Sequence, residues 1–256
     1  MIDAHTHLEW KSYNEDRGEV IDACRKAGVK AIITSCARPW DFDLTMEIVE
    51  KHRGFVFATC GIHPEFIKEI DEKQADAFLD RLRENKDRIV GVGEVGLDFN
   101  WVKEQEWRDR QKELFVKMIG FAKEIKKPLV IHARDAYQET LDILEREGAE
   151  RVMMHMFGDN QLVSRVVGNG YFVSMNAIVL RGKKQRKVVR DTPLEKLMLE
   201  TDAPWLHPDG KGRNDSRTIR VVAEKIAEIK KLDFDHVWKI CGENAVKFFG
   251  LPVKTD

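Results

Sequence analysis

The sequence lacks paired cysteines and long apolar runs. Four cysteines occur among the 256 residues, and no two of them form a CxxC pair; they are Cys24, Cys36, Cys60 and Cys241. Several of them lie in apolar, strand-like runs, where a reduced thiol behaves as a small core residue. No stretch approaches the ~18 apolar residues that a membrane-spanning helix requires, and the first residues do not follow a signal-peptide pattern. We therefore expect buried thiols and a cytoplasmic location.

The sequence also lacks an excess of charge of either sign. It has 43 basic and 44 acidic residues, so any contact with nucleic acid would need a local basic patch. This balance counts against a pure nucleic-acid-binding protein. No Gly/Ser linker, low-complexity tract or proline-rich stretch interrupts the chain, so a domain boundary has no obvious position. We expect one domain over residues 1–256.

Short apolar runs rich in β-branched residues alternate with amphipathic segments of helical length. Residues 105–126 and 218–231, for example, place apolar side chains at three- and four-residue spacings, as a covering helix does. This alternation is typical of repeated βα units and a parallel sheet, either a (β/α)8 TIM barrel or an open doubly wound sheet. The length matches the about 250 residues of a typical barrel. Eight runs predict the strands: MIDAH, AIITSC, FVFATCGI, IVGVGEVGL, PLVIHA, RVMMHMF, YFVSMNAIV and KLMLETDA.

The ends of these runs carry histidines and carboxylates, and their position favours the barrel. The active site of a barrel lies at the carboxyl ends of its strands, where polar side chains have a use. Imidazole is the commonest transition-metal ligand in proteins, and carboxylates commonly complete such sites. We therefore predict a metal site at this end of the barrel, formed by His5 and His7 (first run), Glu94 (fourth), His132 (fifth), His155 (sixth) and Asp202 (eighth).

Six such ligands exceed what one tetrahedral zinc ion uses, whereas two divalent ions that share a carboxylate would use them all. Alternate residues of a strand point to the same side, so His5 and His7 can reach one ion together. Glu94 lies on a run between the two groups and is the expected bridge. We expect one ion at His5, His7, Glu94 and Asp202, and the other at Glu94, His132 and His155.

Five motifs give the chain a family resemblance. They are DAHTH (3–7), GIHP (61–64), GEVGLDF (93–99), IHAR (131–134) and ETDAPWL (200–206), and their order and spacing extend to the ENAVKFFG segment that ends at Gly250. In these features the sequence resembles the TatD family of metal-dependent deoxyribonucleases, in the amidohydrolase superfamily. The resemblance implies a (β/α)8 barrel, two divalent ions and nuclease activity. Its metal ligands fall on the six residues already chosen.

The chemistry of such a site suggests a hypothesis for how these residues would cleave a phosphodiester. Two bound ions lower the pKa of water toward ~7, and Asp202 would orient that water and take its proton, next to the bridging Glu94. A guanidinium suits a phosphate, so Arg134 and His63 are candidate substrate contacts. Their structural alternatives are an ion pair at the barrel rim and a group that orients a ligand. Arg213 and Asn214 match the beginning of a family Arg-Asn-Glu-Pro pattern and are further candidates.

Several features bear on the substrate. The basic segment 181–190, RGKKQRKVVR, could steer a polyanion toward the metals or could be an ordinary solvated helix face. The aromatics Trp10, Phe99, Trp101 and Trp205 follow strand ends and could stack on bases or pack at the rim. The chain departs from the family at Glu65, often histidine, and Gly158, often serine.

Three alternatives stay open at this stage. A small-molecule amide, lactone or ester hydrolase of the same superfamily would use similar chemistry, although many such relatives bridge their metals with a carboxylated lysine rather than a glutamate. Hydrolysis of an aminoacyl ester on RNA and a non-catalytic metal or nucleic-acid binding module are the others. The ions could be Zn, Mn or Mg. We expect DNA as the substrate, single-stranded or at ends, and a monomer.

Overall fold

The computed structural model describes residues 1–255, which form one eight-stranded parallel sheet. The strands follow in sequence order from β1 to β8, and each pairs with the next one along the chain. The (β/α)8 barrel and the eight predicted runs are thereby confirmed. The strands are β1 (Ile2–Thr6), β2 (Ala31–Cys36), β3 (Val56–Cys60), β4 (Gly91–Asp98), β5 (Leu129–Arg134), β6 (Val152–Met154), β7 (Phe172–Met175) and β8 (Leu197–Leu199).

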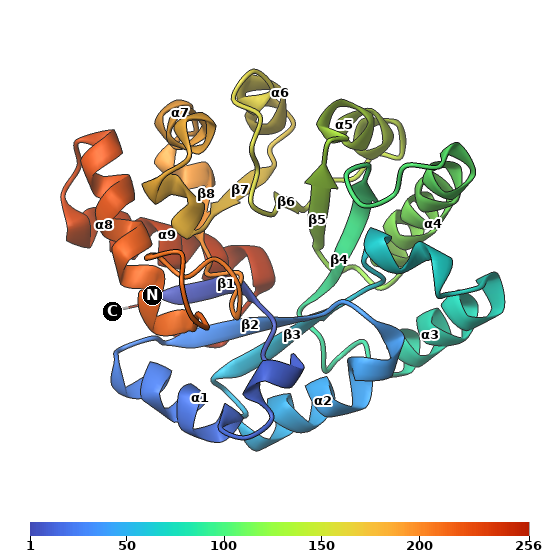
Figure 1. The fold of residues 1–256 in the computed structure, drawn as a ribbon, viewed down its shortest axis with the longest axis horizontal. Helices are drawn as coiled ribbons and strands as arrows, with labels where there is room; N and C mark the ends of the chain where they lie inside the picture. Colours follow the sequence, from blue (N-terminus) through green and yellow to red (C-terminus); the bar gives the residue numbers. More distant parts are fainter. Residues whose placement is uncertain (256) are drawn as a thin grey trace.

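Helices connect the strands and cover the outside of the sheet (Figure 1). The amphipathic segments 105–126 and 218–231 form α4 and α8 as predicted. A further helix, α9, follows α8 directly and packs beside β8 and β1. The helices are α1 (Arg17–Lys26), α2 (Phe42–Lys51), α3 (Glu72–Glu84), α4 (Gln105–Glu124), α5 (Tyr137–Arg146), α6 (Val163–Gly168), α7 (Lys183–Asp191), α8 (Ile219–Lys230) and α9 (Phe234–Phe249).

Short 3-10 helices occupy several of the loops. One of them changes the prediction for the seventh run, because β7 ends at Met175 and the rest of that run forms η4. Asn176 begins the turn, since its side-chain oxygen accepts a hydrogen bond from the backbone N–H of Ile178. The 3-10 helices are η1 (Lys11–Tyr13), η2 (Pro39–Asp41), η3 (Pro64–Lys68), η4 (Ala177–Leu180), η5 (Leu194–Lys196) and η6 (Ser216–Thr218).

The segment after β8 joins β1 and brings the two ends of the sheet together. The backbone N–H of His7 donates to the carbonyl of Ala203 at 2.7 Å, and that of Asp202 donates to the carbonyl of His5 at 3.0 Å. These bonds place Asp202 directly beside the two histidines of β1.

The fourth strand agrees with the predicted run, which covers residues 89–97, but not with the placement of Glu94 at the end of that run. β4 continues to Asp98, so Glu94 lies inside the strand, next to an irregularity in its pairing with β5 between Val92 and Val95. Gly96 allows the close pairing beyond that point. It has φ 143°, and a Cβ built there would lie 2.0 Å from the carbonyl oxygen of His132. Only glycine fits at this position.

Strand residues fill the interior of the barrel. Nearly all residues of the eight strands are buried, and the four cysteines are buried free thiols, as predicted. Within residues 1–255, no helix has both the length and the hydrophobicity needed to cross a bilayer.

Candidate metal centre

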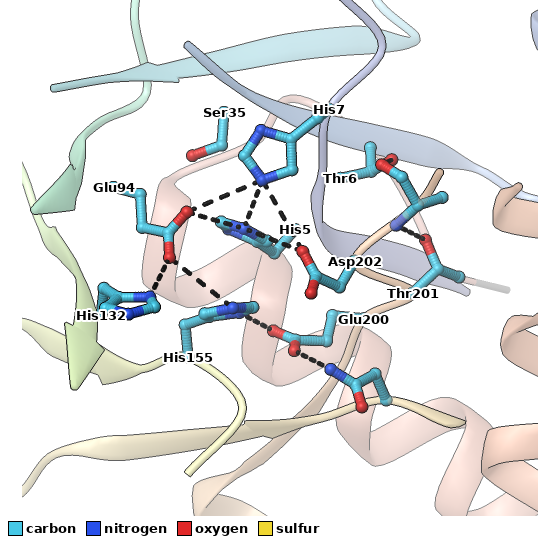
Figure 2. Close-up of polar contacts among 12 residues, drawn as sticks. His5, Thr6, His7, Ser35, Glu94, His132, His155, Glu200, Thr201 and Asp202 are labelled. Carbon is cyan, nitrogen blue, oxygen red and sulfur yellow. Dashed lines mark hydrogen bonds and ion pairs between the residues drawn. The ribbon is translucent and has the colours of Figure 1, made fainter. Parts of the chain in front are cut away.

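Two histidines of the first motif point to one place at the carboxyl end of the barrel (Figure 2). His5 lies in β1 and His7 just beyond it, and their Nε2 atoms are 3.1 Å apart. Both side chains are buried. This is the arrangement expected from residues that alternate along a strand.

Glu94 lies between two groups of histidines. Its Oε2 is 3.4 Å from Nε2 of His5 and 3.6 Å from Nε2 of His7. Its Oε1 is 2.7 Å from Nδ1 of His132 and 3.7 Å from Nε2 of His155. Because each oxygen faces a different pair of imidazoles, the carboxylate is placed as a bridge between two ions would be.

Asp202 completes the first group. Its Oδ1 lies 3.7 Å from Nε2 of both His5 and His7. Its φ of 54° is in the left-handed region, which a residue other than glycine adopts only where its surroundings hold it. Asp3 contributes to this hold, because its carboxylate accepts hydrogen bonds from the backbone N–H (3.0 Å) and hydroxyl (2.6 Å) of Thr201.

Three buried carboxylates bind the outward-facing ring nitrogens of the histidines. Nδ1 of His7 lies 3.1 Å from Glu9, Nε2 of His132 lies 2.9 Å from Asp98, and Nδ1 of His155 lies 2.9 Å from Glu200. Such a partner fixes the ring and leaves the other nitrogen for a metal. The sequence analysis missed Glu9, Asp98 and Glu200. Each lies in or next to a motif, and the rule that metal-binding histidines have carboxylate partners could have found them.

His5 is the exception. It is wholly buried, and its Nδ1 has no hydrogen-bond partner among residues 1–255. Burial together with the nearby His155 lowers the pKa of His5 to about 4, so this imidazole is neutral at pH 7.

The other rings of the set hold protons more tightly in the metal-free protein. Burial lowers the pKa values of His7, His132 and His155, but the neighbouring carboxylates raise them by more. Glu9 raises the pKa of His7 to about 9, Asp98 and Glu94 raise that of His132 to about 9, and Glu200 and Glu94 raise that of His155 to about 10. Burial raises the pKa of Glu94, but the surrounding histidines hold it well below its usual range. Burial raises the pKa of Asp202 to about 6.

The donor set fits a divalent metal. Among residues 1–255 there are three groups of side chains within each of which the donor atoms lie within 4.8 Å of one another: His5, His155 and Asp202; His5, His7 and Glu94; and His63, Glu94 and His132. Zn, Mn and related ions take buried imidazoles and carboxylates as ligands. The ring nitrogen that does not bind the ion is commonly hydrogen-bonded to a carboxylate, as it is in His7, His132 and His155. All six predicted ligands are thus brought together.

His63 lies deeper than a substrate contact at the rim would. Its Nε2 is 3.5 Å from Oε1 of Glu94, and its ring centroid is 4.3 Å from that of His132. Its Nδ1 accepts a hydrogen bond from the backbone N–H of Glu65, and burial lowers its pKa. His63 therefore offers a further donor atom beside Oε1 of Glu94.

The other three predicted substrate contacts are placed differently from one another. Arg134 is exposed at the end of β5, with its guanidinium 5.6 Å from the ring centroid of Trp101. Arg213 instead donates to Asp16 and lies over the ring of Tyr13. This guanidinium is turned to the first helix and not to the centre.

Asn214 is wholly buried, and its side chain is already bonded. Its amide donates to the carbonyl of Thr201 at 3.1 Å, and its oxygen accepts from the hydroxyl of Thr218 at 2.7 Å. Through these bonds Asn214 holds the loop after β8 next to Asp202. Its role as a substrate contact stays a prediction.

The structure also locates the basic segment and one departure from the family. The basic segment 181–190 forms almost the whole of α7, and Lys183 and Lys184 are exposed at the beginning of that helix. At Gly158 a built Cβ would lie 2.6 Å from the hydroxyl of Tyr137, so this tyrosine occupies the space that a serine side chain would need.

Comparison with known proteins agrees with the motifs and the geometry. The family model described as TatD related DNase matches residues 2–250. The chain is a member of the TatD family. Among curated relatives of this TatD-family chain, the human protein named deoxyribonuclease TATDN3 is 31% identical, over 97% of this chain and 94% of the relative. The metal-dependent hydrolase YabD of Bacillus subtilis is 34% identical, over 97% and 98%.

Solved structures of TatD-family proteins also superpose on this chain. YJJV, a TATD homolog from Escherichia coli, superposes with a TM-score of 0.88 at 25% identity, over 98% of both chains. A TatD-family hydrolase from Entamoeba histolytica gives a TM-score of 0.89 at 19% identity, over 97% of both chains, and shows the shared fold. The chain is a metal-dependent hydrolase of this family.

Proposed function

We propose that this protein hydrolyses phosphodiester bonds in DNA with two divalent metal ions, within one barrel domain spanning residues 1–256. The position of Glu94 carries the proposal. Its two oxygens face separate groups of histidines, His5 and His7 on one side and His132 and His155 on the other. The relatives named as deoxyribonucleases support DNA as the substrate.

In this proposal the first ion is held by His5, His7, Glu94 and Asp202, whose facing atoms lie within 3.7 Å of one another across the carboxylate–imidazole pairs. The second is held by Glu94, His132 and His155, where Oε1 of Glu94 lies 2.7 and 3.7 Å from the two rings. Bound there, the two ions would lower the pKa of a water toward ~7 and neutralise charge on a phosphate. The protein's own residues do the rest. Glu9, Asp98 and Glu200 orient three of the imidazoles through their distal nitrogens.

Asp202 is the proposed general base. Its Oδ1 lies next to His5 and His7, and burial raises its pKa to about 6. A base is most effective with a pKa near the operating pH, because it then accepts a proton readily and is still mostly ionised. Asp202 would orient the attacking water, take its proton and return it to the leaving oxygen.

The substrate would enter from the face on which Arg134 is exposed. Its guanidinium has two parallel N–H donors that match two oxygens of a phosphate. His63, beside Glu94, would contact the phosphate nearest the ions or add a donor to the second ion.

The proposal is tested by restoring metals one at a time. The purified protein is stripped of metal and supplied with Mg, Mn or Zn, then given end-labelled single-stranded DNA, aminoacylated RNA and a panel of esters, lactones and amides. We expect DNA cleavage, abolished by His5→Ala and unchanged by His236→Ala, which removes an exposed histidine of α9. Turnover of small molecules without DNA cleavage would instead assign the protein to the small-molecule hydrolases.

A further inference from the structure

Three exposed tryptophans surround the candidate metal centre. Among residues 1–255 the large apolar side chains that remain exposed are Trp40 (52%), Trp101 (59%), Trp205 (42%), Val221 and Leu232. The three tryptophans follow β2, β4 and β8, at the end of the barrel where the metal donors lie. Exposed indoles gathered at one face of a protein mark a binding surface.

Two of these tryptophans belong to a continuous arc, which we call the aromatic rim. In the rim the ring centroids of Trp205 and Trp10 are 5.1 Å apart, and the guanidinium of Arg38 lies 4.6 Å from the Trp10 centroid. The same guanidinium lies 5.6 Å from Trp40 and 5.5 Å from Phe66, and it pairs with Asp41. The rim comprises Trp10, Arg38, Trp40, Phe66 and Trp205.

Both ends of the aromatic rim contact the metal donors. Trp205 lies 5.1 Å from the ring of His7, and Phe66 lies 6.0 Å from the ring of His63. The rim therefore extends from His7, a proposed ligand of the first ion, to His63, which lies beside the proposed ligands of the second ion. Trp101, in the loop after β4, and Arg134, the last residue of β5, form a separate ring–guanidinium pair.

We propose that the aromatic rim and Trp101 are stacking platforms for the unpaired bases that flank the phosphodiester at the metal centre. The inference rests on the proposed function and deepens it to a single-stranded substrate. Flat rings beside a guanidinium suit a polymer in which flat bases alternate with phosphates. Bases inside a duplex stack on their neighbours, so they present no free face to these rings until they are unpaired.

The fold supports two platforms rather than one. Trp40 lies on η2, and Trp101 lies beyond β4, and each is accompanied by an arginine. The metal donors extend from the strands, whereas Trp40 and Trp101 lie on different connections, after β2 and after β4. Bases on either side of the scissile phosphate would therefore meet different rings. Stacking tolerates any base, so this surface would bind single strands with little sequence preference.

The test compares two oligonucleotides of equal length. One is oligothymidylate, and the other is built from 5,6-dihydrothymidine, whose saturated base keeps its hydrogen-bonding edge but has no flat aromatic face. We expect the wild-type enzyme to show a KM roughly tenfold lower for oligothymidylate. Metal content is measured in each sample.

Variants assign the effect to the rings. Trp40→Leu and Trp101→Leu should each raise the KM for oligothymidylate roughly tenfold, with kcat and metal content unchanged and with little effect on the dihydrothymidine oligomer. Trp40→Phe should restore part of the loss. Leu232→Ala is the matched control, because Leu232 is 41% exposed beyond the far end of α8, at the opposite end of the barrel.

The outcomes separate the two proposals. If the wild type cleaves both oligomers with equal KM, or if the Trp40→Leu, Trp101→Leu double variant keeps the wild-type KM, stacking is wrong and nuclease activity stands. If the metal-loaded wild type cleaves neither oligomer, the proposed function fails and the inference fails with it.

Discussion

Glu200 accepts a hydrogen bond from Nδ1 of His155 at 2.9 Å, inside the barrel and out of reach of solvent. Two further donors hold the same carboxylate, the hydroxyl of Ser174 and the amide of Asn176. With three donors around it, Glu200 has one orientation. It therefore fixes the ring of His155 with Nε2 directed toward Glu94.

We expect Glu200→Gln to weaken metal binding or turnover about 10- to 100-fold, because an amide cannot accept from all three donors and lowers the basicity of the imidazole. The measurement is metal affinity by titration, together with kcat. Glu195→Gln, an exposed change just before β8, is the matched control. Wild-type metal affinity and kcat in Glu200→Gln would show that His155 needs no such partner.

Asp202→Asn should lower kcat about 10²- to 10⁴-fold while metal remains bound, because the amide cannot take a proton from water. Metal content is determined on the same sample, and Asp209→Asn in the exposed loop that follows serves as control. Near-normal turnover by a fully loaded Asp202→Asn enzyme would contradict a role as general base.

His63→Ala should weaken binding of one of the two ions about tenfold, since Nε2 of His63 lies 3.5 Å from Oε1 of Glu94. Metal stoichiometry at limiting metal concentration and KM for DNA are measured together. If both ions bind as in the wild type and only KM rises, His63 is a substrate contact, as the motif alone suggested.

Metal affinity should rise with pH. In the metal-free protein the pKa values of His7 and His132 are raised to about 9 and that of His155 to about 10, so these rings carry protons at neutral pH. A metal binds the neutral imidazole and must displace those protons. Titrations with Mn²⁺ between pH 6 and 8.5 should show tighter binding at the higher pH, and calorimetry in buffers of different ionisation enthalpy should detect proton release. Binding that is independent of pH, without proton release, would refute this coupling.

Gly96→Ala should destabilise the fold. The added Cβ would overlap the carbonyl of His132, and φ at this position is 143°. We expect a loss of roughly 3 kcal/mol in the free energy of unfolding, which lowers the Tm by about 2–4 °C per kcal/mol. Thermal unfolding of the metal-free protein measures this. Gly120→Ala is the control, since nothing lies within 4 Å of a Cβ built at that position in α4. Equal Tm values for the two variants would mean that the β4–β5 contact is loose.

The sequence predicted the strands better than it predicted their ends. Hydrophobic alternation is a local property, so all eight runs and the helices α4 and α8 were found. The position of Glu94 inside β4 was not, because it depends on the pairing of β4 with β5 beyond Glu94, which requires Gly96 and follows an irregularity in the register.

By itself the sequence determined the eight strands and the six candidate metal ligands, because strand periodicity and residue type are local properties of the chain, and the ligands at the ends of the runs favoured the barrel over an open sheet. Only the tertiary structure decided which groups meet. Glu200 is 45 residues from His155, and Asp98 is 34 residues from His132, yet each pair shares a hydrogen bond. The tertiary structure also pairs Arg213 with Asp16 and places His63 beside Glu94. Such contacts depend on how distant segments pack and on the direction of each side chain, which no local pattern specifies.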